Sequence, residues 1–371
     1  MKKNRLIDLQ NISVTLGDTP VLQGMNLYIR DKEFITLLGP SGCGKTTTLR
    51  LIAGFLQPDS GEVFFDGKRV GDTPPHRRPV NTIFQRYALF PHLNVADNIA
   101  FGLRLQHKSR VDITRTVDEM LSLVNLKSFA NRAVASLSGG QQQRVAIARA
   151  LAVKPKVLLL DEPLGALDLK LRKDMQLELK KIQRRMGITF VYVTHDQEEA
   201  LSMSDTVVVM DGGEIQQIGT PIDIYNEPVN AFVADFIGES NIVDGIMLRD
   251  DLARFSGHEF VCVDHGFAKD EAVDIVVRPE DVDVVAPDVG MLRGTVTTCT
   301  FKGVHYEMIV DIGGFLWMIQ TTDYSPVGAF IGLHIEPDAI HVMKKSKYSG
   351  LFGDYSCFTE EYYELSEPEE A

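Results

Sequence analysis

Cysteine, long apolar runs and excess positive charge are all scarce in this sequence of 371 residues. Its four cysteines, Cys43, Cys262, Cys299 and Cys357, are far apart and form no C-x-x-C pair, which argues against a disulfide framework or a zinc site. Apolar runs such as Val157–Leu160 are far too short to cross a bilayer, so any work at a membrane would need a partner. The net charge of −13 argues against a broad basic surface, and we expect no nucleic-acid partner.

The length predicts two or three domains. Residues 1–236 alternate short β-like runs with helical periodicity, which predicts an α/β fold with a mostly parallel sheet. Strand signals are missing after residue 87, and we expect a helical subdomain at about 87–150. Residues 237–347 hold short β-branched or aromatic runs separated by Gly and Asp, which predicts an all-β, barrel-like domain. Residues 348–371 are rich in glutamate and are predicted to form a disordered acidic tail.

Individual strands and helices follow from the same periodicities. The predicted strands of the first domain are Phe34–Leu38, Val63–Asp66, Val80–Phe84, Val157–Leu160, Phe190–Thr194 and Val207–Met210. The predicted helices are Lys45–Leu56, Ile113–Val124, Gln141–Ala152 and Leu169–Met186. The predicted strands of the second domain are Val273–Arg278, Thr295–Phe301, His305–Val310 and Phe315–Ile319.

A glycine-rich loop joins the predicted strand Phe34–Leu38 to the helix that begins at Lys45. Residues Gly39–Thr46 fit the phosphate-binding pattern G-x-x-x-x-G-K-[ST] at every fixed position. Small residues let the backbone N–H groups surround phosphate oxygens, and the helix N-terminus and Lys45 add positive charge. Thr46 can offer its hydroxyl to Mg²⁺. The alternative is a glycine-rich turn without a ligand, but the flanking strand and helix favour a nucleoside triphosphate site.

Two adjacent acids end the apolar run Val157–Leu160. The carboxyl ends of parallel strands meet at the ligand-binding edge of a sheet, so Asp161 and Glu162 are expected beside the phosphate loop. We assign Asp161 to magnesium, directly or through water, and Glu162 to the polarisation of the attacking water. An acidic turn without chemistry is the alternative, and the nearby phosphate loop disfavours it.

A second helix start with the features of an anion site lies at Leu137-Ser138-Gly139-Gly140-Gln141. Ser138 is a suitable N-cap, and the two glycines expose the backbone of the following helix. A single nucleotide site does not need two such helix starts. A head-to-tail dimer explains both, with each nucleotide held between the phosphate loop of one copy and Ser138–Gly140 of the other. The alternative is an ordinary serine-capped helix.

These motifs, in this order, resemble the ATPase subunits of ATP-binding-cassette (ABC) transporters over about residues 5–236. Leu137–Gln141 is similar to the signature of that family, Gly39–Thr46 to its Walker A motif and Leu158–Glu162 to its Walker B motif. The resemblance implies a P-loop NTPase cassette that hydrolyses ATP with Mg²⁺.

The resemblance also implies roles for single residues. Gln85 matches the glutamine that contacts magnesium and senses the permease, Asp168 the D-loop aspartate, and His195 the switch histidine, a hydrogen-bond donor to the γ-phosphate that also orients Glu162. Where the family has an adenine-stacking aromatic, this sequence has Leu16, which lacks a π-face; Tyr28 is a weaker substitute. The nucleotide-binding residues are then Leu16, Gly39, Pro40, Ser41, Gly42, Cys43, Gly44, Lys45, Thr46, Thr47, Ser138, Gly139, Gly140, Gln141 and Asp168, with Thr46, Gln85 and Asp161 at the metal.

The segments Val277–Asp281 and Ile335–Pro337 resemble recurring turns of the OB-like TOBE domain of importer ATPases, so the second domain resembles that domain. Asp235–Asn241 and Phe301–Glu307 are most similar to the spermidine/putrescine importers, whereas sugar, ferric iron and sulfate importers share the same layout. This implies a peripheral protein on the cytoplasmic side of the membrane. Its expected partners are a second copy, two permease subunits and, through them, an extracellular solute-binding protein. The apolar segment Tyr87–Leu93 is a permease contact, packing within the helical subdomain, or both for different residues.

Two other functions compete with transport. A cassette ATPase that acts on DNA or ribosomes usually carries an inserted coiled coil or a second cassette, and this acidic sequence has neither. A nucleoside kinase or GTPase would share the phosphate loop, but the segment Leu137–Arg144 and the β domain argue against it.

Overall fold

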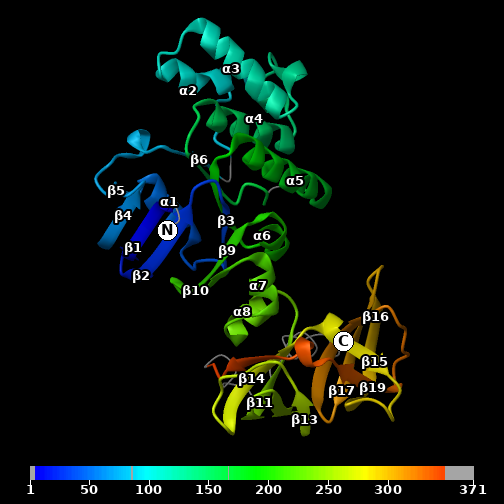
Figure 1. Cartoon of the computed structure of the whole chain (residues 1–371). Helices are drawn as coiled ribbons and strands as arrows, with labels where there is room; N and C mark the ends of the chain where they lie inside the picture. The colour runs from blue at the N-terminus through cyan, green and yellow to red at the C-terminus, as the bar shows by residue number, and fades with distance from the viewer. Residues whose placement is uncertain (1–4, 85–86, 166, 347–371) are drawn as a thin grey trace, which may run out of the picture. The chain divides into compact units, whose positions relative to one another are not determined.

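The computed structural model describes residues 5–84, 87–165 and 167–346. The chain divides into two compact units, Met1–Pro221 and Ile222–Ala371 (Figure 1). The sequence predicts the boundary after residue 236, whereas α7 (Pro221–Asn226) and α8 (Ala231–Phe236) mostly belong to the second unit. The predicted tail, 348–371, lies outside the described residues.

The first unit contains two sheets and six helices within its described residues. Its helices are α1 (Lys45–Ala53), α2 (Val95–Leu105), α3 (Arg110–Leu123), α4 (Gly139–Ala152), α5 (Leu169–Met186) and α6 (Gln197–Met203). An antiparallel sheet in the order β2-β1-β4-β5 consists of β1 (Arg5–Leu16), β2 (Thr19–Arg30), β4 (Ser60–Phe65) and β5 (Lys68–Arg69). A second sheet in the order β10-β9-β3-β8-β7-β6 consists of β3 (Phe34–Leu38), β6 (Val80–Ile83), β7 (Val157–Asp161), β8 (Thr189–Thr194), β9 (Thr206–Asp211) and β10 (Glu214–Gly219).

The second sheet is parallel except for its edge strand β10, which confirms the predicted mostly parallel sheet. Its central strands are covered on both faces. Because side chains alternate across a strand, Leu158 and Leu160 of β7 pack with α2–α5, whereas Val157 and Leu159 pack with α1 and the first sheet. Two-sided burial explains why β7 is a continuous apolar run. Because β3, β7 and β8 run parallel, their carboxyl ends lie at one edge of the sheet.

Helices α2, α3 and α4 gather at one end of the first unit, next to β6 (Figure 1). The buried Asn98 of α2 fixes the segment before it, since its side chain bonds the N–H and the carbonyl of Phe90. The Phe90 ring lies 4.3 Å from the ring of Phe101, and Tyr87 is buried. These residues of Tyr87–Leu93 therefore pack within the helical subdomain.

The second unit is built from antiparallel strands. One sheet, β13-β12-β11-β14-β20, consists of β11 (Asn241–Arg249), β12 (Leu252–Phe255), β13 (His258–Val261), β14 (Glu271–Val277) and β20 (His341–Lys344). The other, β15-β19-β16-β17-β18, consists of β15 (Val282–Val285), β16 (Leu292–Phe301), β17 (Tyr306–Ile312), β18 (Phe315–Thr321) and β19 (Phe330–Ile335). The two sheets share one core around the fully buried Trp317, with Phe255 and Phe260 packed nearby. The expected all-β second domain is confirmed.

Two short helices belong to the second unit because of specific contacts. Ala231 and Ala234 of α8 pack in one apolar cluster with Val276 of β14. The buried Arg278 guanidinium donates to the carbonyls of Ala234 and Tyr225, and it stacks 4.2 Å from the Tyr225 ring. These contacts explain why the division falls after Pro221, the first residue of α7, rather than after α8.

No helix in the described ranges combines the length and the hydropathy needed to cross a membrane.

Candidate functional site

The phosphate loop lies between β3 and α1, as the sequence predicts. Gly44 is the N-cap of α1 and has a left-handed backbone, with φ of 101°. A Cβ at Gly44 would lie 2.6 Å from Cδ2 of Leu22 and 3.2 Å from the carbonyl oxygen of Val21, so both the backbone and the packing require glycine. The loop is therefore held tightly between the sheet and the β1–β2 hairpin.

Lys45 closes this loop from inside. Its ammonium donates to the carbonyls of Gly39 at 2.7 Å and Pro40 at 2.8 Å, and its side chain is 5% exposed. Cys43 is also buried, and its Sγ lies 3.6 Å from Lys45 Nζ. Burial raises the pKa of the Cys43 thiol. A buried thiol with a raised pKa is a packing residue rather than a nucleophile.

Two of the three predicted magnesium ligands, Thr46 and Asp161, contact each other. The Thr46 hydroxyl donates to Asp161 Oδ1 at 2.9 Å, although 115 residues separate them. Mg²⁺ prefers oxygen ligands and is usually bound by one or two carboxylates together with substrate phosphates. One hydroxyl and one carboxylate fit that preference, and the described residues contain no cluster of three acidic, His or Cys side chains that would form a full cage. Burial raises the pKa of Asp161, and a cation beside it would favour the ionised form.

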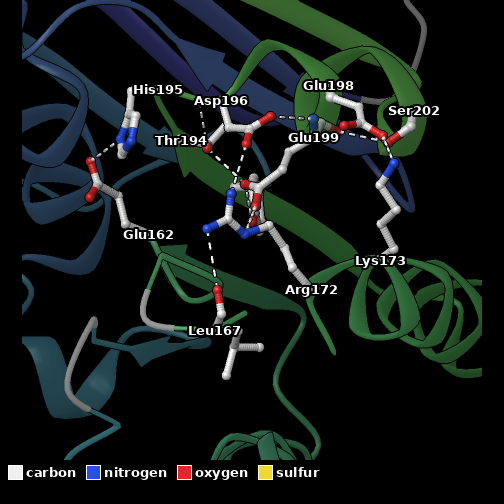
Figure 2. A network of polar contacts seen from close by, with 11 residues as sticks. Glu162, Leu167, Arg172, Lys173, Thr194, His195, Asp196, Glu198, Glu199 and Ser202 are labelled. Atoms are coloured by element: carbon white, nitrogen blue, oxygen red, sulfur yellow. Dashed lines mark hydrogen bonds and ion pairs between the residues drawn. The ribbon is translucent and has the colours of Figure 1, made fainter. Parts of the chain in front are cut away.

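Glu162 and His195 follow neighbouring parallel strands, β7 and β8, and face each other. His195 Nδ1 lies 3.3 Å from Glu162 Oε1, and Figure 2 shows the two side chains pointing toward one another. The Glu162 N–H donates to the carbonyl of Val193 in β8, which anchors its backbone. Both side chains remain accessible, with 27% of Glu162 and 60% of His195 exposed. A carboxylate and an imidazole are thus available together at the sheet edge.

The Glu162 backbone has φ of 44°, in the left-handed region, and Pro163 follows it. A non-glycine residue in this region stores strain, and a following proline further restricts its backbone. Such strain persists where the surrounding structure fixes a side chain in one position. Here it turns the Glu162 carboxylate out of the β7 strand line and toward His195.

Ser138 begins α4 with a reciprocal pair of hydrogen bonds. Its hydroxyl oxygen accepts from the Gln141 N–H at 3.4 Å, and the Gln141 side chain accepts from the Ser138 N–H at 3.0 Å. This capping box uses the Ser138 oxygen as an acceptor, so the hydroxyl proton can still be donated to a phosphate. A Cβ at Gly140 would lie 2.8 Å from Cδ2 of Leu171 in α5, so this glycine permits close packing of α4 on α5.

Asp168 also caps a helix. It precedes α5, and its carboxylate accepts from the Leu171 N–H at 3.0 Å. The expected nucleotide-binding role of Asp168 is thus combined with a local structural one. Gln85, expected at the metal, lies outside the described residues.

Leu16 stands at the end of β1 in the hairpin with β2, and 46% of its side chain is exposed. Leu16 pairs with Thr19 across the hairpin. Three residues further along β2, Leu22 packs against the phosphate loop at Gly44. Tyr28 does not replace it. The Tyr28 ring is flanked by Arg5 and Arg30, and its hydroxyl accepts from Arg30. Tyr28 is therefore a surface-strand residue.

Two arginines with contacts to these segments are absent from the sequence-based prediction. Arg149 of α4 donates to the carbonyls of Tyr87 and Ala88, two consecutive residues with positive φ that follow the Gln85 segment. Arg172 of α5 donates to Asp196, beside His195. Both contacts join segments that are far apart in the sequence, so no local pattern points to them.

Comparisons with known proteins identify matching family models and a similar solved structure. A family model described as ABC transporter matches residues 22–165, and one described as TOBE domain matches residues 275–343. A solved structure, cbiO1 from Clostridium perfringens, part of the ABC transporter complex cbiONQ, is 30% identical with a TM-score of 0.57, and the match covers 60% of this chain and 92% of that chain.

Relatives cover most of the chain. The spermidine/putrescine import ATP-binding protein PotA of Desulfitobacterium hafniense (strain Y51) is 60% identical over 342 residues, 92% of this chain and 98% of the relative. The protein of the same name from Clostridium novyi (strain NT) is 59% identical over 92% of this chain and 98% of its own length. That from Bacteroides thetaiotaomicron is 57% identical over 94% of this chain and 75% of its own length. The chain therefore belongs to the ABC transporter family, in the group of the spermidine/putrescine import ATP-binding proteins.

Proposed function

We propose that this chain binds and hydrolyses ATP at the cytoplasmic face of a membrane and thereby drives the import of spermidine and putrescine through a separate permease. One observation carries the proposal: the Thr46–Asp161 contact lies at the same sheet edge as the Glu162–His195 pair. This arrangement supplies a phosphate loop, metal ligands and a carboxylate for water, the parts that phosphoryl transfer to water requires. The polyamine assignment rests on the names of relatives that are about 60% identical.

Within this proposal each residue has a distinct task. Gly39–Thr47 hold the phosphates, Thr46, Asp161 and Gln85 hold Mg²⁺, and Glu162 accepts a proton from the attacking water. Bound magnesium would neutralise phosphate charge. His195 lies 3.3 Å from Glu162 and orients it, and His195 donates its N–H to the γ-phosphate once ATP is bound. Leu16 offers an apolar contact to the base.

We further propose that two copies assemble head to tail. Ser138, Gly139, Gly140 and Gln141 of one copy would then close over the nucleotide on the phosphate loop of the other, with Asp168 at the same interface. The hydroxyl proton of Ser138 is available for this, because the capping box uses only the oxygen as an acceptor. ATP would favour the closed pair and ADP would not, so that hydrolysis resets the cycle.

Lys45→Ala tests nucleotide binding. We expect the variant to bind ATP about 10- to 100-fold more weakly, because it loses charge-assisted bonds to phosphate worth about 1.5–3 kcal/mol. Isothermal titration with ATP measures the change. Lys154→Ala, an exposed lysine after α4, serves as the control and should bind like the wild type. Equal affinity in Lys45→Ala would contradict the assignment of the loop.

A groove in the first unit is the candidate permease contact. It encloses about 710 Å³, and its lining includes Phe55 and Phe84, whose exposed rings lie 6.0 Å apart. Phe84 directly precedes the Gln85 segment, so an apolar permease segment seated here would sit next to the residue expected to sense it.

Phe55→Glu tests this contact. We expect the permease to be lost on co-purification, because a charge would be buried in an apolar contact, whereas the isolated chain should keep its affinity for ATP. Val111→Glu changes an exposed apolar side chain of α3 that does not line the groove, and should leave the complex intact. Retention of the permease by Phe55→Glu would place the contact elsewhere.

The decisive experiment is transport. The chain is co-expressed with the permease subunits that co-purify with it and reconstituted in vesicles. ATP-dependent uptake of labelled spermidine and putrescine is then compared with uptake of sugars, ferric iron and sulfate. Uptake of one of these others, with no polyamine uptake, would keep the ATPase assignment and overturn the substrate.

A further inference from the structure

Arg172 of α5 lies between two segments of the site that the sequence separates. One guanidinium nitrogen donates to Asp196 Oδ2 at 3.1 Å, and the other terminal nitrogen donates to the Leu167 carbonyl at 3.3 Å. Leu167 precedes Asp168, and Asp196 follows His195. Figure 2 shows the guanidinium between the Leu167 carbonyl and the acidic side chains of Asp196 and Glu199. One side chain therefore joins the Asp168 segment to the His195 segment.

The His195 segment is held firmly on its own side of this contact. Glu199 of α6 is 3% exposed, and its Oε2 accepts from the hydroxyls of Thr194 and Tyr192, each at 2.7 Å. Asp196 Oδ1 accepts from the Glu199 N–H at 3.0 Å, and the Asp196 N–H donates to the Thr194 hydroxyl. Residues 194–199 thus form a linked unit, and a movement of Asp196 carries His195 with it.

Electrostatic attraction holds Arg172 against residues 194–199. Besides Asp196, its Nε lies 4.0 Å from Glu199 Oε1, so the cation faces two carboxyl groups. About a quarter of the Arg172 and Asp196 side chains is exposed, so water screens the ion pair only in part. A guanidinium can bond a carboxylate and a carbonyl at the same time through separate nitrogens, and an ammonium offers no such fixed fork.

We propose that Arg172 is a positioning residue that couples the Leu167–Asp168 segment to the Glu162–His195 pair. The proposal rests on the proposed function, in which Asp168 lies at the interface with the second copy. Closure of the two copies would press on Leu167–Asp168, and Arg172 would pass that displacement through Asp196 to His195. The switch histidine would then reach its working position only when the partner is in place.

The chain contains a matched control next to Arg172. Lys173 also joins α5 to α6, since its Nζ lies 3.0 Å from Glu198 Oε1 (Figure 2). Both partners of this pair are more than half exposed. Among the residues that the structure describes, no hydrogen bond or ion pair joins Lys173 to Leu167 or Asp196. Lys173→Met therefore breaks a helix–helix ion pair without cutting the proposed coupling.

The experiment compares Arg172→Met, Arg172→Lys and Lys173→Met in the full chain. We expect Arg172→Met to lower kcat by about 10- to 100-fold, the equivalent of a lost charge-assisted contact, while the Kd for ATP changes less than about twofold. Arg172→Lys should recover part of kcat, because an ammonium can reach Asp196 without also bonding Leu167. Lys173→Met should keep the wild-type kcat.

Two outcomes would overturn the coupling. One is an Arg172→Met kcat equal to that of Lys173→Met. The other is a parallel loss of ATP affinity, kcat and melting temperature in Arg172→Met and Arg172→Lys alike, which would mark a purely structural residue. If Arg172→Met does not fold, Arg172→Lys decides, and a wild-type kcat in it would refute the need for the fork. No hydrolysis by the wild-type chain would overturn the proposed function itself, and the coupling with it.

Discussion

Replacing Glu162 by Gln is expected to lower ATP hydrolysis by about 10²- to 10⁴-fold, the contribution typical of a positioned general base. The amide keeps the size of the side chain and can still bond His195, 3.3 Å away, but it cannot take a proton from water. ATP binding should persist, because the phosphate loop with Lys45 and the Thr46–Asp161 pair are untouched. Steady-state phosphate release and ATP titration measure the two effects separately.

The same substitution should stabilise the dimer. If closure is driven by ATP and reversed by hydrolysis, a chain that binds ATP without cleaving it accumulates in the closed pair. Size-exclusion chromatography with light scattering, with and without ATP, detects this. Glu119→Gln, on the exposed surface of α3, is the isosteric control and should behave as wild type. Wild-type turnover in Glu162→Gln would show that another group activates the water.

The parts of the fold that sequence predicts well are those with strong local signals. β3, β7 and β8 are buried on both faces and are therefore nearly continuous apolar runs, and α5 begins and ends at the predicted residues. Helix α1 ends at Ala53 rather than at Leu56, because Gly54 adopts a left-handed backbone that closes the helix. Gly54 marks the end of the helix in the sequence. The apolar residues Phe55 and Leu56 continue the helical pattern beyond this glycine and hide the end.

Other elements are missed for physical reasons. The β1–β2 hairpin has several register shifts, for example between Leu9 and Ile12, and each interrupts the two-residue alternation that marks a strand. Helix α2 contains Asn98 and Gly102, which weaken a helical prediction. The fully buried Asn98 bonds the backbone of Phe90, and only the folded chain supplies that partner.

The candidate site divides in the same way. Thr46, Asp161, Glu162 and His195 are predictable because parallel strands must end at one edge, and the structure brings them into contact. The arrangement of Arg172 depends on how α5 packs beside α6, which is set by tertiary contacts rather than by spacing. The proposed sharing of the site by two copies is harder still to predict, since some of its residues would face a partner. Within one chain the Ser138 hydroxyl oxygen accepts from the Gln141 N–H, which is a local helix cap.

Ser138→Arg tests that sharing. We expect the variant to bind ATP with wild-type affinity but to fail to dimerise, because a long cationic side chain replaces the hydroxyl where the partner's nucleotide must fit. Hydrolysis should fall by about 10²- to 10³-fold, as when a group that stabilises developing charge is lost. Ser109→Arg is the control for the cap itself: Ser109 caps α3 through the Asp112 N–H, so its loss should cost about 1 kcal/mol of stability and leave dimerisation intact.

Mixing two inactive variants gives the sharpest form of this test. In a head-to-tail pair of Lys45→Ala with Ser138→Arg, the introduced arginine faces only the loop that lacks Lys45 and binds ATP weakly, so it meets no tightly held nucleotide. The other site joins an intact phosphate loop to an intact Ser138. The mixture should therefore hydrolyse ATP well above either variant alone, and activity should rise with the fraction of mixed pairs. A site complete within one chain contains one defect in every copy, so it predicts no recovery at any ratio. Recovery thus requires that residues from two copies meet at one nucleotide.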